Sequence, residues 1–216
     1  MLTLRDARAV LVGDRIGPGH VLGIDQAKSS GWALVELGAR RCVLSGTARS
    51  PAAQEDTIAL LAGLPGFSWR SVLVVLEDHS FMPAHIGMPI KTILSLGESR
   101  GRWMALLSQA GQPAEARMLC PPATWRRVLA PKGAKKKRAE WKREAKRWAS
   151  LATGKPIKSD DEAEAIAIAT WGSVEGLARW AEQRTELAAA PRPKPAPRPK
   201  PKPCPKPKSK PQRLSA

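Results

Sequence analysis

The sequence SVLVVLE, residues 71–77, contains an unbroken run of five apolar side chains that ends in Glu77. A short apolar run of this kind is typical of a strand buried on both faces of a sheet. The sequence HVLGID, residues 20–25, has the same character and ends in Asp25. The two runs therefore predict buried strands of one sheet, each of which ends in an acidic residue.

The segments around these strands predict an α/β fold. Residues 32–36 and 41–48 are short apolar segments that follow the first strand closely, a spacing that favours an antiparallel meander. Apolar periodicity then predicts a strand at 114–119 and helices at 51–61, 91–110, 122–129, 138–151 and 160–183. The expected organisation is a lead-in at 1–19, one folded domain at 20–185 and a tail at 186–216.

The charge of the chain predicts a polyanionic partner. Its 216 residues include 36 Lys and Arg against 19 Asp and Glu, a net charge of +17. Hydrophobic residues make up 43% of the chain, which is enough to form a core. Nucleic acid is the expected partner of so basic a protein.

Membrane and secreted classes do not fit the sequence. The longest stretch without a charged residue, 57–69, has 13 residues and is too short to cross a bilayer. No basic segment followed by an apolar one opens the chain, so no secretory signal is expected. The three scattered cysteines, Cys42, Cys120 and Cys204, argue against a disulfide scaffold or a zinc site. They favour a reducing compartment, and we expect a cytoplasmic location without membrane association.

Two basic segments are candidates for contact with DNA. Residues 190–216 hold nine Lys and Arg, no acid and half of the 20 prolines, which predicts a disordered, polyproline-like arm. This arm could bind the DNA backbone, solubilise the protein or serve as a ligand for a proline-binding module. Residues 126–147 hold eleven Lys and Arg against two acids, interleaved with tryptophans. A helix face that only contacts solvent would not need so large an excess of basic over acidic residues, so we favour phosphate contact there.

Acidic residues supply the candidate chemistry. A lone acid at a strand end is usually a cap or a solvated turn residue, but Asp25 and Glu77 would end neighbouring strands of one sheet. In the predicted helix at 160–183, Asp161 and Glu164 are three residues apart and share a face. We expect Asp160 and Glu162, off the site, to be capping or solvated residues, as acids at a helix start often are.

Four converging carboxylates would require cations between them. Carboxylates at short range cannot all remain ionised without a compensating charge. Mg²⁺ accepts a few carboxylates together with waters and a phosphate. Two such ions stabilise the attacking and leaving oxygens when a phosphodiester is hydrolysed. An acidic cluster in a basic protein therefore indicates a nuclease.

Five segments resemble, in order along residues 20–175, the RuvC-like Holliday junction resolvases of the ribonuclease H superfamily, in particular their phage and prophage type. They are VLGIDQAKSSGWALVE (21–36), LEDHSFM (76–82), SLGESRGRWMALL (95–107), CPPATWRRVLAPKGAKKK (120–137) and DDEAEAIAIA (160–169). The resemblance implies a ribonuclease H-like mixed five-stranded sheet flanked by helices. It also implies a homodimeric crossover junction endodeoxyribonuclease that cuts branched DNA in recombination and repair, in a bacterial or phage-infected cell.

The resemblance also assigns roles to residues. It implies that Asp25, Glu77, Asp161 and Glu164 bind the metal and carry out catalysis. It further implies two Mg²⁺ or Mn²⁺ ions and no small-molecule cofactor. DNA contact falls to Phe81, Lys132, Lys135, Lys136, Lys137 and Arg138, although Phe81 could equally be a core residue. The chain departs from the family at Glu164, where Asp is usual, and at Ser30, where Thr is commoner.

Two hypotheses from different classes remain. The first is a metal-dependent, structure-selective endonuclease, with junctions or a broader range of branched DNA as its substrate. The second is a non-catalytic nucleic-acid-binding protein with a decayed ribonuclease H-like fold. The four acidic positions favour the enzyme, because a decayed site would usually have lost one of them.

Overall fold

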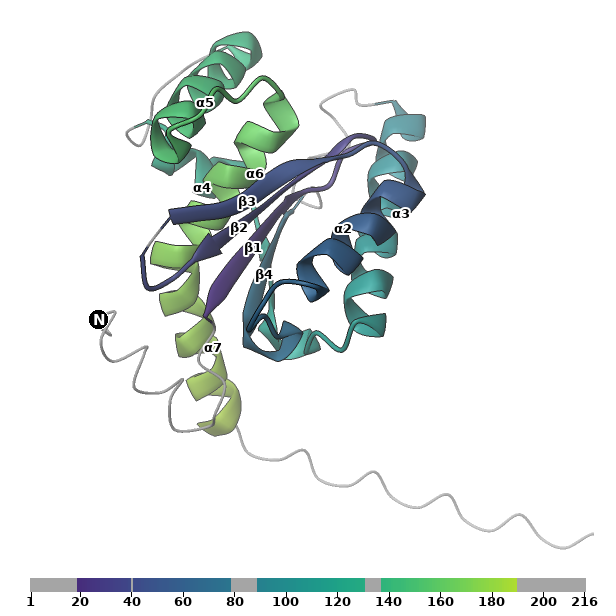
Figure 1. Ribbon diagram of the computed structural model, residues 1–216, viewed down its shortest axis with the longest axis vertical. Coiled ribbons are helices and arrows are strands. Elements are labelled where there is room, and N and C mark those ends of the chain that lie inside the picture. Colours follow the sequence, from purple (N-terminus) through teal and green to yellow (C-terminus); the bar gives the residue numbers. More distant parts are fainter. Residues whose placement is uncertain (1–18, 40, 79–88, 131–136, 190–216) are drawn as a thin grey trace, which may run out of the picture.

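A five-stranded mixed sheet forms the centre of the protein (Figure 1). The computed structural model describes residues 19–39, 41–78, 89–130 and 137–189. The strands are β1 (His20–Asp25), β2 (Ser30–Glu36), β3 (Arg41–Ala48), β4 (Val72–Glu77) and β5 (Arg117–Cys120). Their order is β3-β2-β1-β4-β5; β1, β2 and β3 form an antiparallel meander, and β4 is parallel to both β1 and β5. The predicted mixed five-stranded sheet is confirmed.

The register of the two central strands positions their terminal acids. In the parallel pair, Ile24 of β1 lies opposite Leu76 of β4. The next residues in the two strands are Asp25 and Glu77, which therefore end side by side at the same edge of the sheet. All six residues of β4 are buried, as its unbroken apolar run predicts.

Helices cover both faces of the sheet. They are α2 (Pro51–Ala62), α3 (Ile90–Gln109), α4 (Pro122–Trp125), α5 (Arg138–Thr153), α6 (Asp160–Trp171) and α7 (Leu177–Ala189). Short helical turns are η1 (Trp69–Ser71), η3 (Ala114–Ala116), η4 (Arg126–Val128) and the π-helical turn η5 (Gly172–Gly176). On one face α2 and α3 pack against the sheet, and on the other α4, α5, α6 and α7 do so (Figure 1).

The strands divide the core into two layers because alternate side chains point to opposite faces. In β1, Leu22 and Ile24 pack in the layer that contains Trp103 of α3. Val21 packs in the opposite layer, with Ile166 of α6.

Two glycines let α6 lie directly on the sheet. A Cβ on Gly23 would be 2.4 Å from the backbone nitrogen of Ala169, and one on Gly31 would be 1.8 Å from the carbonyl oxygen of Asp161. Neither contact leaves room for a side chain, because backbone atoms cannot rotate away. The close approach fixes the first turns of α6 beside the ends of β1 and β2.

The last helical segment differs from the prediction. Residues 160–183 were expected to form one helix, whereas the structure has α6, the π-helical turn η5 and α7, which ends at Ala189. A π turn holds an extra residue and changes the face that the following residues present. Trp171, Leu177 and Trp180 all pack in the same core layer as a result. Periodicity alone does not reveal such a turn.

The remaining elements lie within a few residues of their predicted positions. The predicted helix at 122–129 is α4 followed by the 3₁₀ turn η4, and the predicted strand at 114–119 is η3 followed by β5. In the described ranges, no helix is both long enough and apolar enough to cross a membrane.

Candidate active site

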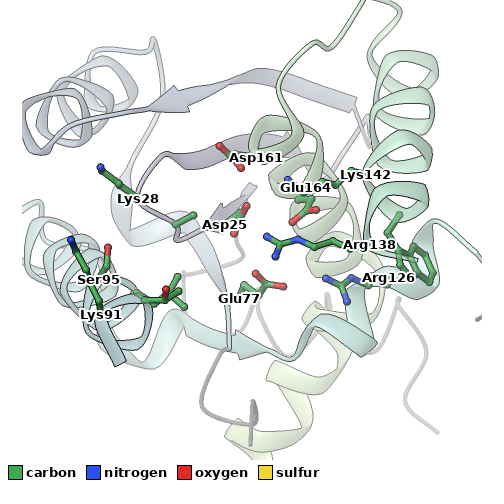
Figure 2. Close-up of a pocket in the computed structure, with 14 residues that line it drawn as sticks. Asp25, Lys28, Glu77, Lys91, Ser95, Arg126, Arg138, Lys142, Asp161 and Glu164 are labelled. Atoms are coloured by element: carbon green, nitrogen blue, oxygen red, sulfur yellow. The ribbon is translucent and has the colours of Figure 1, made fainter. Parts of the chain in front are cut away.

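Three carboxylates meet at the edge of the sheet where β1 and β4 end. Asp25 ends β1, Glu77 ends β4, and Glu164 lies one turn into α6. One oxygen from each lies within 4.8 Å of the others. Asp25 and Glu77 are only 4% and 3% exposed, so this cluster lies on the floor of the site rather than on an open surface (Figure 2).

Asp161, the fourth predicted acid, lines the same cleft. It precedes Glu164 by three residues on α6, and Figure 2 shows it on the same side of that helix, above Asp25. The group within 4.8 Å comprises Asp25, Glu77 and Glu164. The structure thus brings all four predicted acids to one cleft and places three of them within the reach of a single ion.

The two neighbouring acids on α6 have other partners. The N-cap is Ser159, whose hydroxyl accepts a hydrogen bond from the backbone N–H of Glu162 at 3.3 Å. Asp160 therefore does not cap the helix; it forms ion pairs with Lys142 at 3.0 Å and Lys146 at 2.9 Å. Glu162 is not simply solvated, because it accepts a hydrogen bond from Ser45 of β3 at 2.7 Å. Both acids secure α6 to its neighbours.

Burial and mutual repulsion make the cluster costly to ionise. Burial raises the pKa of Asp25 well above its ordinary value, and the charges of Glu77, Glu164 and Asp161 raise it further. Burial and then the charge of Glu77 raise the pKa of Glu164 to about 7, while Arg126 and Lys142 act in the opposite direction. A divalent cation would relieve this repulsion. The all-oxygen donor set suits a hard ion such as Mg²⁺ or Mn²⁺.

Cations flank the acidic floor on two sides. The acids lie in a cleft of about 670 Å³. Lys28, from the turn after β1, and Lys91, from α3, line one side of it. Arg126, Arg138 and Lys142 line the other side, toward the carboxylates (Figure 2). The cleft thus combines an acidic floor with basic walls, as binding of a phosphodiester next to bound metal requires.

Arg126 and its two tryptophans were not among the predicted site residues. Its guanidinium carbon lies 5.1 Å from the ring centre of Trp125 and 5.9 Å from that of Trp141. The indole N–H of Trp125 donates a hydrogen bond to Glu77 Oε1 at 2.9 Å. The signal in the sequence was the Trp-Arg pair at 125–126, at the start of the basic segment and separated from β5 only by α4.

The predicted DNA-contact residues divide into two groups. Arg138 lines the cleft, and Lys137 is exposed at the start of α5, where its backbone N–H donates to Glu140 Oε2 at 2.8 Å. Phe81, Lys132, Lys135 and Lys136 lie outside the described residues, as do residues 1–18 of the predicted lead-in (1–19) and residues 190–216 of the predicted tail (186–216), whose first residues, 186–189, belong to α7. Their roles in DNA binding stay predictions.

Comparison with known proteins adds information at the level of the fold. No protein-family model and no curated protein matches the sequence. Thermus thermophilus RuvC in complex with Holliday junction substrate is similar, with a TM-score of 0.56 and 17% identity over 74% of this chain and 96% of that chain. A further structure of Thermus thermophilus RuvC gives a TM-score of 0.52 and 17% identity, over 77% of this chain and 96% of the other.

A third similar structure is the yeast mitochondrial Holliday junction resolvase Ydc2. Its TM-score is 0.39 at 14% identity, over 84% of this chain and 87% of that chain. The two RuvC structures share the mixed sheet and its flanking helices with this chain over nearly their whole length. The chain therefore has the ribonuclease H-like fold of RuvC.

Proposed function

We propose that this chain is a metal-dependent, structure-selective endonuclease that hydrolyses phosphodiesters in Holliday junctions or other branched DNA during recombination and repair. The observation that carries the proposal is the triad of Asp25, Glu77 and Glu164, within 4.8 Å of one another, at the floor of a cleft with basic walls. The likeness to a RuvC solved with a Holliday junction substrate supports branched DNA as the substrate class.

The acidic residues would hold the metal. Asp25, Glu77, Asp161 and Glu164 offer oxygen ligands for Mg²⁺ or Mn²⁺, and we propose two ions per site. Bound there, the ions would activate a water as nucleophile and stabilise the leaving oxygen, so that no covalent enzyme intermediate forms. The protein's own contribution is to keep the carboxylates in place: β1 and β4 end side by side, and α6 lies directly on the sheet.

The basic walls would hold the DNA backbone. Lys28 and Lys91 face the cleft from one side and Arg126 and Arg138 from the other, so a strand lying in the cleft would meet cations on both sides of the scissile phosphate. Contacts of this kind position DNA without selecting its sequence. Lys132, Lys135, Lys136, Lys137 and the tail at 190–216 would add further contacts with the DNA backbone, and the affinity they contribute would fall as salt rises.

We further propose that the enzyme is a homodimer that pairs through the first half of α3. Ile90, Ile93 and Leu94 are 76%, 46% and 62% exposed there. On the same helix, a Cβ added to Gly97 or Gly101 would meet no atom within 4 Å, so a second helix could approach closely. A two-fold dimer would present two cleavage sites, as two nicks in opposed strands require. A cytoplasmic location, favoured by the scattered cysteines, completes the proposal.

The test is cleavage of a synthetic four-way junction. The wild-type protein should nick the junction with Mg²⁺, should stop when the metal is chelated, and should cut a linear duplex of the same sequence far more slowly. Glu77→Gln should bind the junction but not cut it. The control is Glu55→Gln, which removes an exposed acid on α2 and should leave cleavage unchanged. Junction binding by the wild type without cleavage would support the non-catalytic alternative instead.

A further inference from the structure

Trp125 connects the acidic floor of the cleft to one of its basic walls. It is 1% exposed and lies at the end of α4, directly before η4. Its indole N–H donates to Glu77 Oε1 at 2.9 Å across 48 residues of sequence. A buried donor on one oxygen restricts rotation of a carboxylate, and indole has a single donor to offer. The orientation of Glu77 is therefore tied to the position of this ring.

The same ring supports Arg126. The guanidinium carbon of Arg126 is 5.1 Å from the centre of the Trp125 ring and 5.9 Å from that of Trp141, which belongs to α5. Within the described residues, the buried Nε of Arg126 has no hydrogen-bond partner. Two aromatic faces thus support the guanidinium, which lines the cleft beside the carboxylates (Figure 2).

We infer that Trp125 is a positioning residue, which orients Glu77 as a metal ligand through its N–H and holds Arg126 at the cleft through its ring face. The inference rests on the proposed function and adds that one side chain performs two separate tasks. The N–H serves the metal site. The ring serves the cation that would meet the phosphate. Partners that orient metal ligands typically contribute 10- to 100-fold to metal affinity.

Substitutions can separate the two tasks. Trp125→Phe keeps an aromatic face under Arg126 and removes the donor to Glu77, so metal affinity should fall about tenfold or more. Arg126→Gln removes a positive charge next to the acids, so metal affinity should not fall, whereas affinity for DNA should. Trp148→Phe is the matched control: Trp148 packs against the same core layer from α5, and its loss should change neither property.

The measurement is isothermal titration calorimetry of Mn²⁺ into the full-length variants without DNA, followed by junction binding in Ca²⁺. Circular dichroism and urea unfolding establish that each variant is folded. A folded Trp125→Phe with wild-type Mn²⁺ affinity would overturn the inference. So would an equal loss of Mn²⁺ affinity in Trp148→Phe, since that would assign the effect to core packing.

A second measurement covers the case in which Trp125→Phe does not fold. In ¹⁵N-labelled wild-type protein, one indole N–H resonance should shift on titration with Mg²⁺ and should lose that response in Glu77→Gln. Absence of any responding indole resonance while Mg²⁺ binds would overturn the inference. A wild-type protein that binds Mn²⁺ but does not cut DNA would refute the proposed nuclease activity and leave the affinity comparison valid.

Discussion

Helices α3 and α6 lie on opposite faces of the sheet and both reach the cleft with their first turns, yet they are attached very differently. The first half of α6 lies against backbone atoms of the sheet, and Ala163, Ala165 and Ile166 are buried. The first half of α3 is exposed, and this helix is anchored further along by Trp103 and Leu107. The rigidly placed helix carries the acids, and the less covered one carries the apolar surface proposed for a partner subunit.

The largest expected effect comes from the acids on α6. Asp161→Asn and Glu164→Gln should each lower the single-turnover cleavage rate by about a thousandfold or more, because a lost ligand charge disrupts the metal site but not the basic walls. Glu162→Gln and Asp160→Asn should remain active. Their partners are Ser45 and two lysines of α5, so only a cost of about 1 kcal/mol in stability is expected. An inactive Asp160→Asn with an active Asp161→Asn would show that the site residues are wrongly assigned.

The next effect tests the contact between α6 and the sheet. Gly31→Ala should lower the free energy of unfolding by about 3 kcal/mol or more, because its Cβ would overlap the backbone of Asp161. Gly101→Ala on α3 meets no atom of its own chain. In the Leu94→Asp background, where the proposed dimer contact is removed, it should instead raise stability by up to about 1 kcal/mol, since alanine favours a helix. Urea unfolding of both variants measures the comparison. Equal changes in the free energy of unfolding would mean that α6 is packed no more tightly than α3.

A third prediction concerns pH and metal. The pKa of Glu164 is about 7 in the folded protein against an ordinary 4.5, so between these values the folded state binds more protons than the unfolded state. Metal-free stability should therefore fall as pH rises from about 4.5 to 7, by roughly 1–3 kcal/mol. Saturating Mg²⁺ should restore the lost stability at pH 8. Glu164→Gln should make the stability of the metal-free protein less dependent on pH. Stability that rises with pH through this window in the chelated protein would contradict the prediction.

The smallest effect on the folded monomer is expected on α3. Leu94→Asp should change the stability of the monomer by less than about 0.5 kcal/mol, because the side chain is 62% exposed. It should nevertheless halve the mass measured by analytical ultracentrifugation if the dimer forms there. Leu60→Asp, on the 51% exposed Leu60 of α2, is the matched control and should remain dimeric. A monomeric wild type, or a dimeric Leu94→Asp, would reject this surface.

Several features of the site follow from local sequence. The apolar runs at 20–25 and 71–77 predict strands because burial on both faces demands continuous apolar residues. The three-residue spacing of Asp161 and Glu164 predicts a shared helix face, and both do line the cleft. Capping was predicted less well. Ser159 and Asp160 are both good N-cap residues, and two structural observations distinguish them: Ser159 accepts a hydrogen bond from the N–H of Glu162, and Asp160 pairs with lysines of α5.

The sequence by itself determined the strands and most of the helices, and it singled out the four acids as candidates, because periodicity and helix spacing act over a few residues. Tertiary structure decided which side chains meet. The hydrogen bond from Trp125 to Glu77 depends on where α4 follows β5. The placement of Asp161 and Glu164 beside Asp25 depends on the close approach of α6 to Gly23 and Gly31 of the sheet. Such contacts join residues far apart in the chain. They arise only when strand register and helix packing bring those residues together, so no local pattern encodes them.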